Sequence, residues 1–245
     1  MHDPITKNPF SESASLAVDD PFFTSPHVST SGRVYGELRS RIISLEMPPG
    51  ATVARNELAD QFNVSQSPVR EAILRLEQDG LMISYPQSRT VVTYIDVARV
   101  HEEHFLRLAV ECEVVRCLAE KPDAETIRKA KGFLKMQAAL VDDIEQSVLF
   151  KQLDEAFHET LFAGVGQLSL HRHVTARCGN LARVRSIDLP RPEKMSAVLA
   201  GHQAVLDAME TGDGDAAARM MREHLSGSMK RLPQIVKDNP DFFSK

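Results

Sequence analysis

The spacing of apolar residues divides the chain into two parts. Between residues 33 and 95 a helical spacing of three and four positions gives way to the alternation typical of β-strands. The first helix should stop before the Met-Pro-Pro-Gly sequence at 47–50, because proline disfavours helical backbone in the residue before it. The pattern predicts three helices over 33–45, 56–62 and 67–80, and two strands over 81–83 and 90–95.

From residue 96 onward the sequence consists of long amphipathic segments without a strand pattern. Breaks at glycine and proline predict six helices, near 97–121, 123–143, 147–164, 168–187, 193–210 and 213–232. We therefore expect a mainly α protein with a winged helix-turn-helix over 33–95 and an all-helical bundle over 96–235. Residues 1–32, rich in Ser, Pro and Asp, predict a disordered tail, and 236–245 a C-terminal tail.

The third predicted helix has the character of a DNA-reading helix. Its apolar residues fall within one arc, and Ser65 or Ser67 can cap its N-terminus. Gln66, Ser67 and Arg70 point away from the apolar arc at the end that enters a major groove. Arg can reach guanine or phosphate, Gln can pair with adenine, and Ser can bond a phosphate. A helical hairpin in an all-α core has the same periodicity, but the turn, the cap and the outward Arg70 favour DNA binding.

Composition narrows the possibilities further. The formal net charge is −5, yet residues 33–95 contain seven Arg and seven acids and are neutral, so DNA binding must depend on where the arginines lie. Three cysteines and the lack of a secretory signal indicate reduced thiols. No apolar run approaches the roughly 20 residues of a membrane span. We expect a soluble cytoplasmic protein with no membrane partner.

Histidines and one aspartate form a second candidate site. Asp154 and His158 are four residues apart on one predicted helix and project to the same side. His202 and His224 each lie at the centre of the apolar arc of another helix. Two inward imidazoles that face a carboxylate and a third imidazole can hold a divalent metal. A single buried His more often only bonds a neighbour, but this combination favours the metal.

Short motifs run through the first predicted domain: Val34-Tyr35-x-x-Leu38-Arg39-x-x-Ile42, Pro49-Gly50, Glu57-Leu58-Ala59, Val64-Ser65-x-x-Pro68-Val69-Arg70-Glu71-Ala72 and Leu76-Glu77-x-x-Gly80-Leu81. With them, residues 33–232 resemble the GntR family of bacterial transcription regulators, FadR subfamily, with an FCD-type C-terminal domain. The resemblance implies a homodimer whose paired winged helices bind a palindromic operator, usually to repress. It also implies that Arg70 is the main DNA contact, helped by Ser65 and Ser67.

Two residues depart from the family pattern in this domain. Gln66 stands where the family often has Arg, which can alter base preference. Thr90 follows Arg89 where the wing tip usually has Gly, so the approach of Arg89 and the wing to the minor groove stays open.

The resemblance extends to the second site. Many FCD domains form a metal site from three histidines and one aspartate, and Asp154, His158, His202 and His224 match that pattern. Zinc or nickel is the metal that it implies. Gly201 replaces the acid that more often precedes the second His, which can remove a supporting contact.

Arg107 matches a family Arg that can face this pocket and bind the carboxylate of an effector. A surface Arg107 bonded to Glu111, four residues on, is the alternative. Arg177, Arg183 and Arg185 are weaker candidates for this pocket, and solvated side chains are the favoured interpretation for all three.

The leading hypothesis is a ligand-responsive transcriptional repressor, released from its operator by a small carboxylate or hydroxy acid bound at the metal site. The alternative is a metal-dependent helical enzyme with an appended DNA-binding module. Against an enzyme, no general base or nucleophile motif stands beside the ligands. A constitutive DNA-binding protein with a structural metal is a third possibility.

Overall fold

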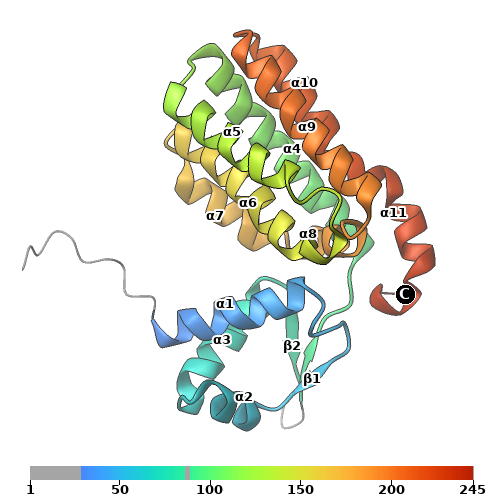
Figure 1. Ribbon diagram of the computed structural model, residues 1–245. Coiled ribbons are helices and arrows are strands. Elements are labelled where there is room, and N and C mark those ends of the chain that lie inside the picture. The colour runs from blue at the N-terminus through green and yellow to red at the C-terminus, as the bar shows by residue number, and fades with distance from the viewer. Residues whose placement is uncertain (1–28, 86–88, 245) are drawn as a thin grey trace, which may run out of the picture.

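The computed structural model describes residues 29–85 and 89–244. A small N-terminal domain lies at one end of a taller helical bundle, and the C-terminus lies beside the junction between them (Figure 1). This arrangement confirms the predicted fold class, a winged helix-turn-helix followed by an all-helical domain. Residues 1–28, most of the predicted tail, and 86–88, the predicted wing tip, lie outside the described residues.

The N-terminal domain packs three helices against a small antiparallel sheet. Its elements are α1 (Thr30–Ile43), β1 (Thr52–Val53), α2 (Arg55–Phe62), α3 (Gln66–Gln78), β2 (Met82–Ser84) and β3 (Thr90–Val92). The strand order is β1-β3-β2, so the predicted hairpin has an additional edge strand, β1. Two residues are too few to display alternation, which is why the sequence did not predict β1. α1 also begins three residues before its predicted start, with the Ser29 hydroxyl accepting a 3.0 Å bond from the Gly32 amide.

The C-terminal domain is a helical bundle throughout. Its α-helices are α4 (Val97–Glu120), α5 (Ala124–Ala138), α6 (Ser147–Gly164), α7 (Leu168–Arg177), α8 (Gly179–Asp188), α9 (Pro192–Glu210), α10 (Gly214–Leu225) and α11 (Gly227–Asp238), with a short 3-10 turn at Ile144–Gln146. The prediction of six helices is wrong, because two predicted segments each contain two helices. The breaks fall at Cys178 and Ser226. A single Gly follows each, and one Gly inside a helical pattern is usually tolerated, so neither position signalled a break.

The break at Cys178 brings the two domains together. α8 starts with Gly179, and a β-carbon there would lie only 2.7 Å from a methyl carbon of Leu81 in the N-terminal domain. Arg183 of α8, fully buried, donates to the Thr93 carbonyl at 2.6 Å. Arg39 of α1 donates to the Thr175 carbonyl of α7 at 2.5 Å. The N-terminal domain therefore rests on α7 and α8.

The last residues of the described chain belong to the same junction. The predicted C-terminal tail, 236–245, contains the end of α11 and a 3-10 turn at Pro240–Phe242. Phe243 is buried, and its strand-like bridge to Ile95 is flanked by bonds from the Ile95 amide to the Phe242 carbonyl and from the Ser244 amide to the Ile95 carbonyl, both 2.9 Å. Residues 236–244 are thus part of the folded structure rather than a tail. None of the described helices is long and apolar enough to cross a membrane.

Candidate functional site

The N-terminal end of α3 is an exposed polar surface on a rigid support. Val69, Ala72, Ile73 and Leu76 are buried on the opposite side of α3. Gln66, Ser67 and Arg70 are exposed, as is Ser65 at the N-cap position. Ser65 occupies the predicted N-cap position, but its side chain makes no capping hydrogen bond. The residues predicted to read DNA therefore lie together and face solvent.

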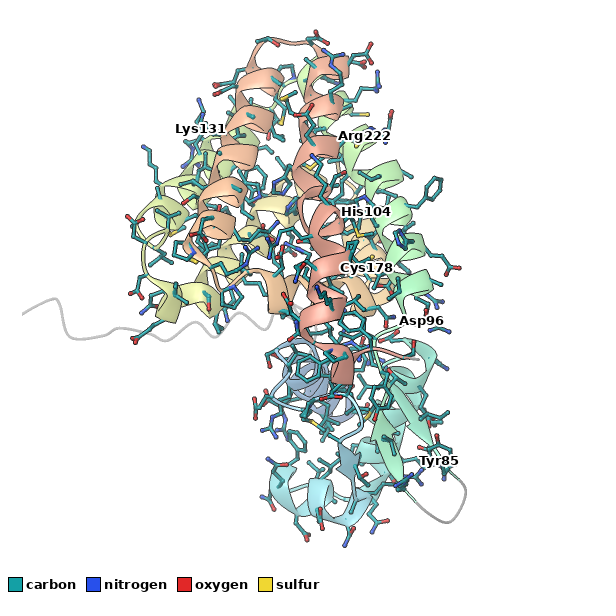
Figure 2. The ribbon with its side chains drawn as sticks, turned by 90° about the vertical axis from the view of Figure 1, so that its right-hand side faces the viewer. Tyr85, Asp96, His104, Lys131, Cys178 and Arg222 are labelled. Atoms are coloured by element: carbon teal, nitrogen blue, oxygen red, sulfur yellow. The ribbon has the colours of Figure 1, made fainter. Side chains whose placement is uncertain are left out.

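Tyr85, directly after β2, lies at the end of the N-terminal domain away from the bundle, and Asp96 lies at the junction with the helical domain (Figure 2). Arg89 is exposed, and its guanidinium carbon lies 5.8 Å from the centre of the Tyr85 ring. Arg89 is thus available to DNA on the wing side, while the wing tip itself lies outside the described residues.

Four predicted ligands converge inside the bundle. Asp154 and His158 come from α6, His202 from α9 and His224 from α10, and one ligand atom from each lies within 4.8 Å of the others. Asp154, His158 and His202 are buried, and His224 is half-buried. The Nε2 atoms of His158 and His224 face each other at 3.3 Å. The structure therefore brings the predicted set together from three helices.

Two buried side chains that the sequence did not link to the ligands orient these imidazoles. A Glu111 carboxylate oxygen on α4 lies 2.6 Å from His158 Nδ1. The Gln137 side-chain oxygen on α5 lies 2.8 Å from His202 Nδ1, which makes that nitrogen the N–H donor. Both contacts use Nδ1 and leave Nε2 of each ring directed toward the other candidate ligands, as supporting carboxylates and carbonyls do in metal sites. The signal in the sequence for Gln137 was its place on the apolar face of α5, beside Leu134 and Ala130.

The chemistry of the cluster fits a metal of borderline softness. His202 is fully buried, and its Nε2 has no hydrogen-bond partner although Asp154 Oδ1 lies 3.4 Å away. Burial lowers the pKa of His202 to about 4 and the pKa of His224 well below its usual value, so both imidazoles are neutral. Burial alone would raise the pKa of Asp154, but Arg185 and the imidazoles hold it well below its usual range. One carboxylate and three imidazoles, two of them neutral by burial, are a donor set that fits zinc or nickel.

Gly201 leaves room for the His224 side chain in this site. A β-carbon at Gly201 would lie 2.6 Å from His224 Nδ1 and 3.2 Å from His224 Cβ. The His224 side chain therefore packs directly on the backbone of α9, where only glycine leaves room. The departure from the family pattern removes an acid and at the same time admits the fourth ligand.

Two arginines adjoin the ligands. Arg107 bonds Glu111 at 2.5 Å, four residues on, as the alternative interpretation required, but it is buried and lines the cavity beside the cluster. Arg185 forms an ion pair with Asp154, so the expectation that it is solvated is wrong. The same expectation is wrong for Arg183, which is fully buried at the domain junction, whereas Arg177 is exposed.

The cavity beside the cluster is narrow and bordered by both domains. Arg107, Asp154 and His158 of the bundle line it together with Arg39 and Ile43 of α1. The Arg39 Nε atom is buried there and has no hydrogen-bond partner. A molecule in this cavity would touch the N-terminal domain directly.

Comparison with known proteins identifies both domains. Residues 30–92 match the family described as bacterial regulatory proteins, gntR family, and residues 102–227 match the FCD domain. The chain is 33% identical over 220 residues, 88% of its length and 92% of the relative's, to an uncharacterized HTH-type transcriptional regulator of Streptomyces ambofaciens. It is 28% identical over 221 residues to the HTH-type transcriptional repressor RspR of Escherichia coli K12, covering 90% and 96% of the two chains.

Solved structures share the fold. E. coli McbR/YncC superposes with a TM-score of 0.70 at 17% identity, covering 86% of this chain and 99% of the other. A putative transcriptional regulator from Rhodococcus sp. RHA1 gives 0.66 at 23% identity, covering 84% and 97%. The family models and the curated relatives are of transcriptional regulators, which argues against the alternative of a metal-dependent enzyme. The chain belongs to the GntR family of bacterial transcriptional regulators and has a GntR-type DNA-binding domain joined to an FCD domain.

Proposed function

We propose that the chain is a cytoplasmic repressor that releases its operator when a small organic acid binds beside a metal in the FCD domain. The DNA-binding part of the proposal rests on α3, whose exposed Ser65, Gln66, Ser67 and Arg70 would enter the major groove. Arg89 would contact DNA from the wing. Two copies of the chain would present two such helices to the halves of a palindromic operator.

Asp154, His158, His202 and His224 would hold the metal, zinc or nickel. The free Nε2 atom of His202 supports this assignment, because a buried nitrogen without a partner costs free energy that a metal would offset. The contacts of Glu111 and Gln137 to the Nδ1 atoms support it as well. A bound metal would supply a Lewis-acid position for a carboxylate or hydroxyl oxygen of the effector.

The observation that carries the regulatory part is the shared lining of the cavity. Arg107 would pair with the effector carboxylate, and Arg39 of α1 borders the same space. An effector that attracts Arg39 would weaken its 2.5 Å bond to the Thr175 carbonyl, which joins α1 to α7. The effector would then bind the two domain arrangements with different affinities, and that difference is what couples effector and operator.

The test measures operator affinity of the zinc-loaded full-length protein on duplexes selected from a random pool. Fluorescence anisotropy is recorded with and without lactate, malate, glycerate and 3-phosphoglycerate at millimolar concentration. We expect at least one acid to weaken operator binding about 10-fold or more, as typical coupling energies allow. Unchanged affinity at saturating acid would contradict the proposed regulation.

Variants with Ala at His202 and His224 separate the proposal from a constitutive DNA-binding protein with a structural metal. Both classes lose the metal in these variants. Only the proposed repressor also loses its response to the acid, while Asp207→Asn on the exposed side of α9 serves as the control. Sedimentation of the protein alone and with operator reports whether the binding unit is the homodimer.

A further inference from the structure

A second cavity on the other side of the candidate ligands is strongly cationic. Residues of α4, α6, α8, α9, α10 and α11 line it, and it shares Arg107, Asp154, Leu181 and Arg185 with the first cavity. Two lysines, Lys151 of α6 and Lys194 of α9, complete its charged lining. Four cations and one carboxylate thus line the cavity, while Glu111 and Asp188 contact Arg107 and Lys194 from outside the lining.

Each of the two arginines has a carboxylate partner, whereas neither lysine has a carboxylate that pairs with it alone. Arg107 pairs with Glu111, and Arg185 pairs with Asp154. Among the residues that the structure describes, the ammonium of Lys151 bonds the Ser186 hydroxyl at 2.8 Å and forms no ion pair, so Glu155 and Asp154 act on its charge only from a distance.

Lys194 shares its carboxylate with closer competitors. Its ammonium is 3.6 Å from Asp188, but Arg191 and Arg231 lie nearer to the same carboxylate, at 2.6 and 3.0 Å. One negative charge therefore serves three cations, and the charge of Lys194 remains largely uncompensated.

Burial makes this imbalance costly. Loss of solvent lowers the pKa of Lys151 to about 8, and it lowers the pKa of Lys194 for the same reason. Lysine side chains usually extend their ammonium groups into water, so two that remain in a cavity without carboxylates of their own point to an absent anion. A metal on Asp154 would add to the imbalance, because it would compete with Arg185 for that carboxylate.

We propose that the effector carries two anionic groups, the first beside the metal ligands and Arg107 and the second beside Lys151 and Lys194. This inference rests on the proposed function and names the class of its effector: a dicarboxylate or a phosphorylated hydroxy acid. Either second group accepts charge-assisted hydrogen bonds from ammonium groups. An acid with a single carboxylate would leave both lysines uncompensated.

Two pairs of probes isolate the second charge. Malate differs from lactate by one carboxylate, and 3-phosphoglycerate differs from glycerate by one phosphate. Calorimetric titration of zinc-loaded full-length protein should show the dianion of at least one pair binding about 10-fold or more tighter than its monoanionic partner. In Lys151→Met and Lys194→Met the ratio should fall toward one, while zinc affinity and monoanion affinity stay unchanged.

Stability provides an independent check that the variants fold. Removing a half-buried charge that has no ion-pair partner of its own should leave the melting temperature of the ligand-free protein equal or higher, with Lys237→Met on the exposed side of α11 as the control. If acids bind but the second charge brings no gain, or the gain survives in both variants, this inference is overturned alone. If no acid binds the wild-type protein, the proposed function fails with it.

Discussion

The reading surface of α3 and the buried cluster of the FCD domain meet opposite physical demands. Gln66, Ser67 and Arg70 are exposed and are positioned only by the apolar back of their own helix. Asp154 and His202 are buried, and contacts from other helices orient them. A change on the reading surface should therefore alter one interaction, whereas a change in the cluster should alter metal binding, protonation and packing together.

Asp154→Asn should have the largest effect, because it removes the only carboxylate among the candidate ligands while nearly preserving volume. Loss of a supporting contact weakens metal binding by about 10–100-fold, so loss of a direct ligand should exceed about 100-fold. Competition with a zinc-binding dye measures the affinity. Asp207→Asn is the matched control, since Asp207 is exposed on α9 and bonds only Gln203 at 2.7 Å among the described residues. Equal zinc affinity in the two variants would remove Asp154 from the site.

Acid should destabilise the chelator-treated protein through the cluster. Burial holds the pKa of His202 at about 4 in the folded state, against about 6.5 in an unfolded chain. Between these values only the unfolded chain binds the proton, so the free energy of unfolding falls as the pH falls from 6.5 to 4. The loss from this group approaches about 3 kcal/mol.

Urea denaturation at several pH values in this window tests the effect. His202→Gln cannot bind the proton and should show a shallower dependence of stability on pH than the wild-type protein. Parallel pH profiles for the two proteins would mean that His202 is not protected from protonation. The reading surface offers no comparable effect, since its exposed groups are equally solvated in both states.

Arg70→Ala should weaken operator binding by about 10–100-fold, the loss expected for one arginine that bonds a base. Stability and zinc affinity should not change, because the Arg70 side chain is exposed. Anisotropy on the selected operator measures the effect, and Arg128→Ala, an exposed arginine on α5, controls for the loss of one positive charge. Equal losses in both variants would indicate bulk attraction instead of a specific contact. The α3 surface would then bind DNA without a specific contact from Arg70.

The two regions also differ in how far the sequence predicted them. The exposure of Arg70 and its neighbours could be predicted from one helix, because periodicity defines which side of that helix is buried. The spacing of Asp154 and His158 predicted in the same way that they share one side of a helix. The partners of the cluster did not: Gln137 bonds a histidine 65 residues away, and Arg185 pairs with an aspartate 31 residues away. Such pairings depend on how helices pack, and a local pattern carries no information about them.

Gly201 shows the same limit on a smaller scale. From the sequence it was a departure that removes an acid, whereas in the structure it makes room for His224. Gly201→Ala should weaken zinc binding about 10-fold, because the added methyl would force the His224 side chain away from α9 and out of its position among the ligands. Gly132→Ala on α5 is the matched control, since a β-carbon there meets no described atom within 4 Å.

The alanine substitutions at Gly132 and Gly201 should also differ in their effect on stability. Alanine favours helix over glycine by about 1 kcal/mol, so Gly132→Ala should raise stability and leave zinc affinity unchanged. In Gly201→Ala the same gain in helix propensity is offset by the close contact with His224. Its zinc affinity should therefore fall while its stability does not rise. Operator affinity in the absence of zinc and acid should be the same in both variants. If Gly201→Ala binds zinc as the wild-type protein does, His224 is not held against α9 when metal binds, and the cluster is more adaptable than the reading surface rather than less.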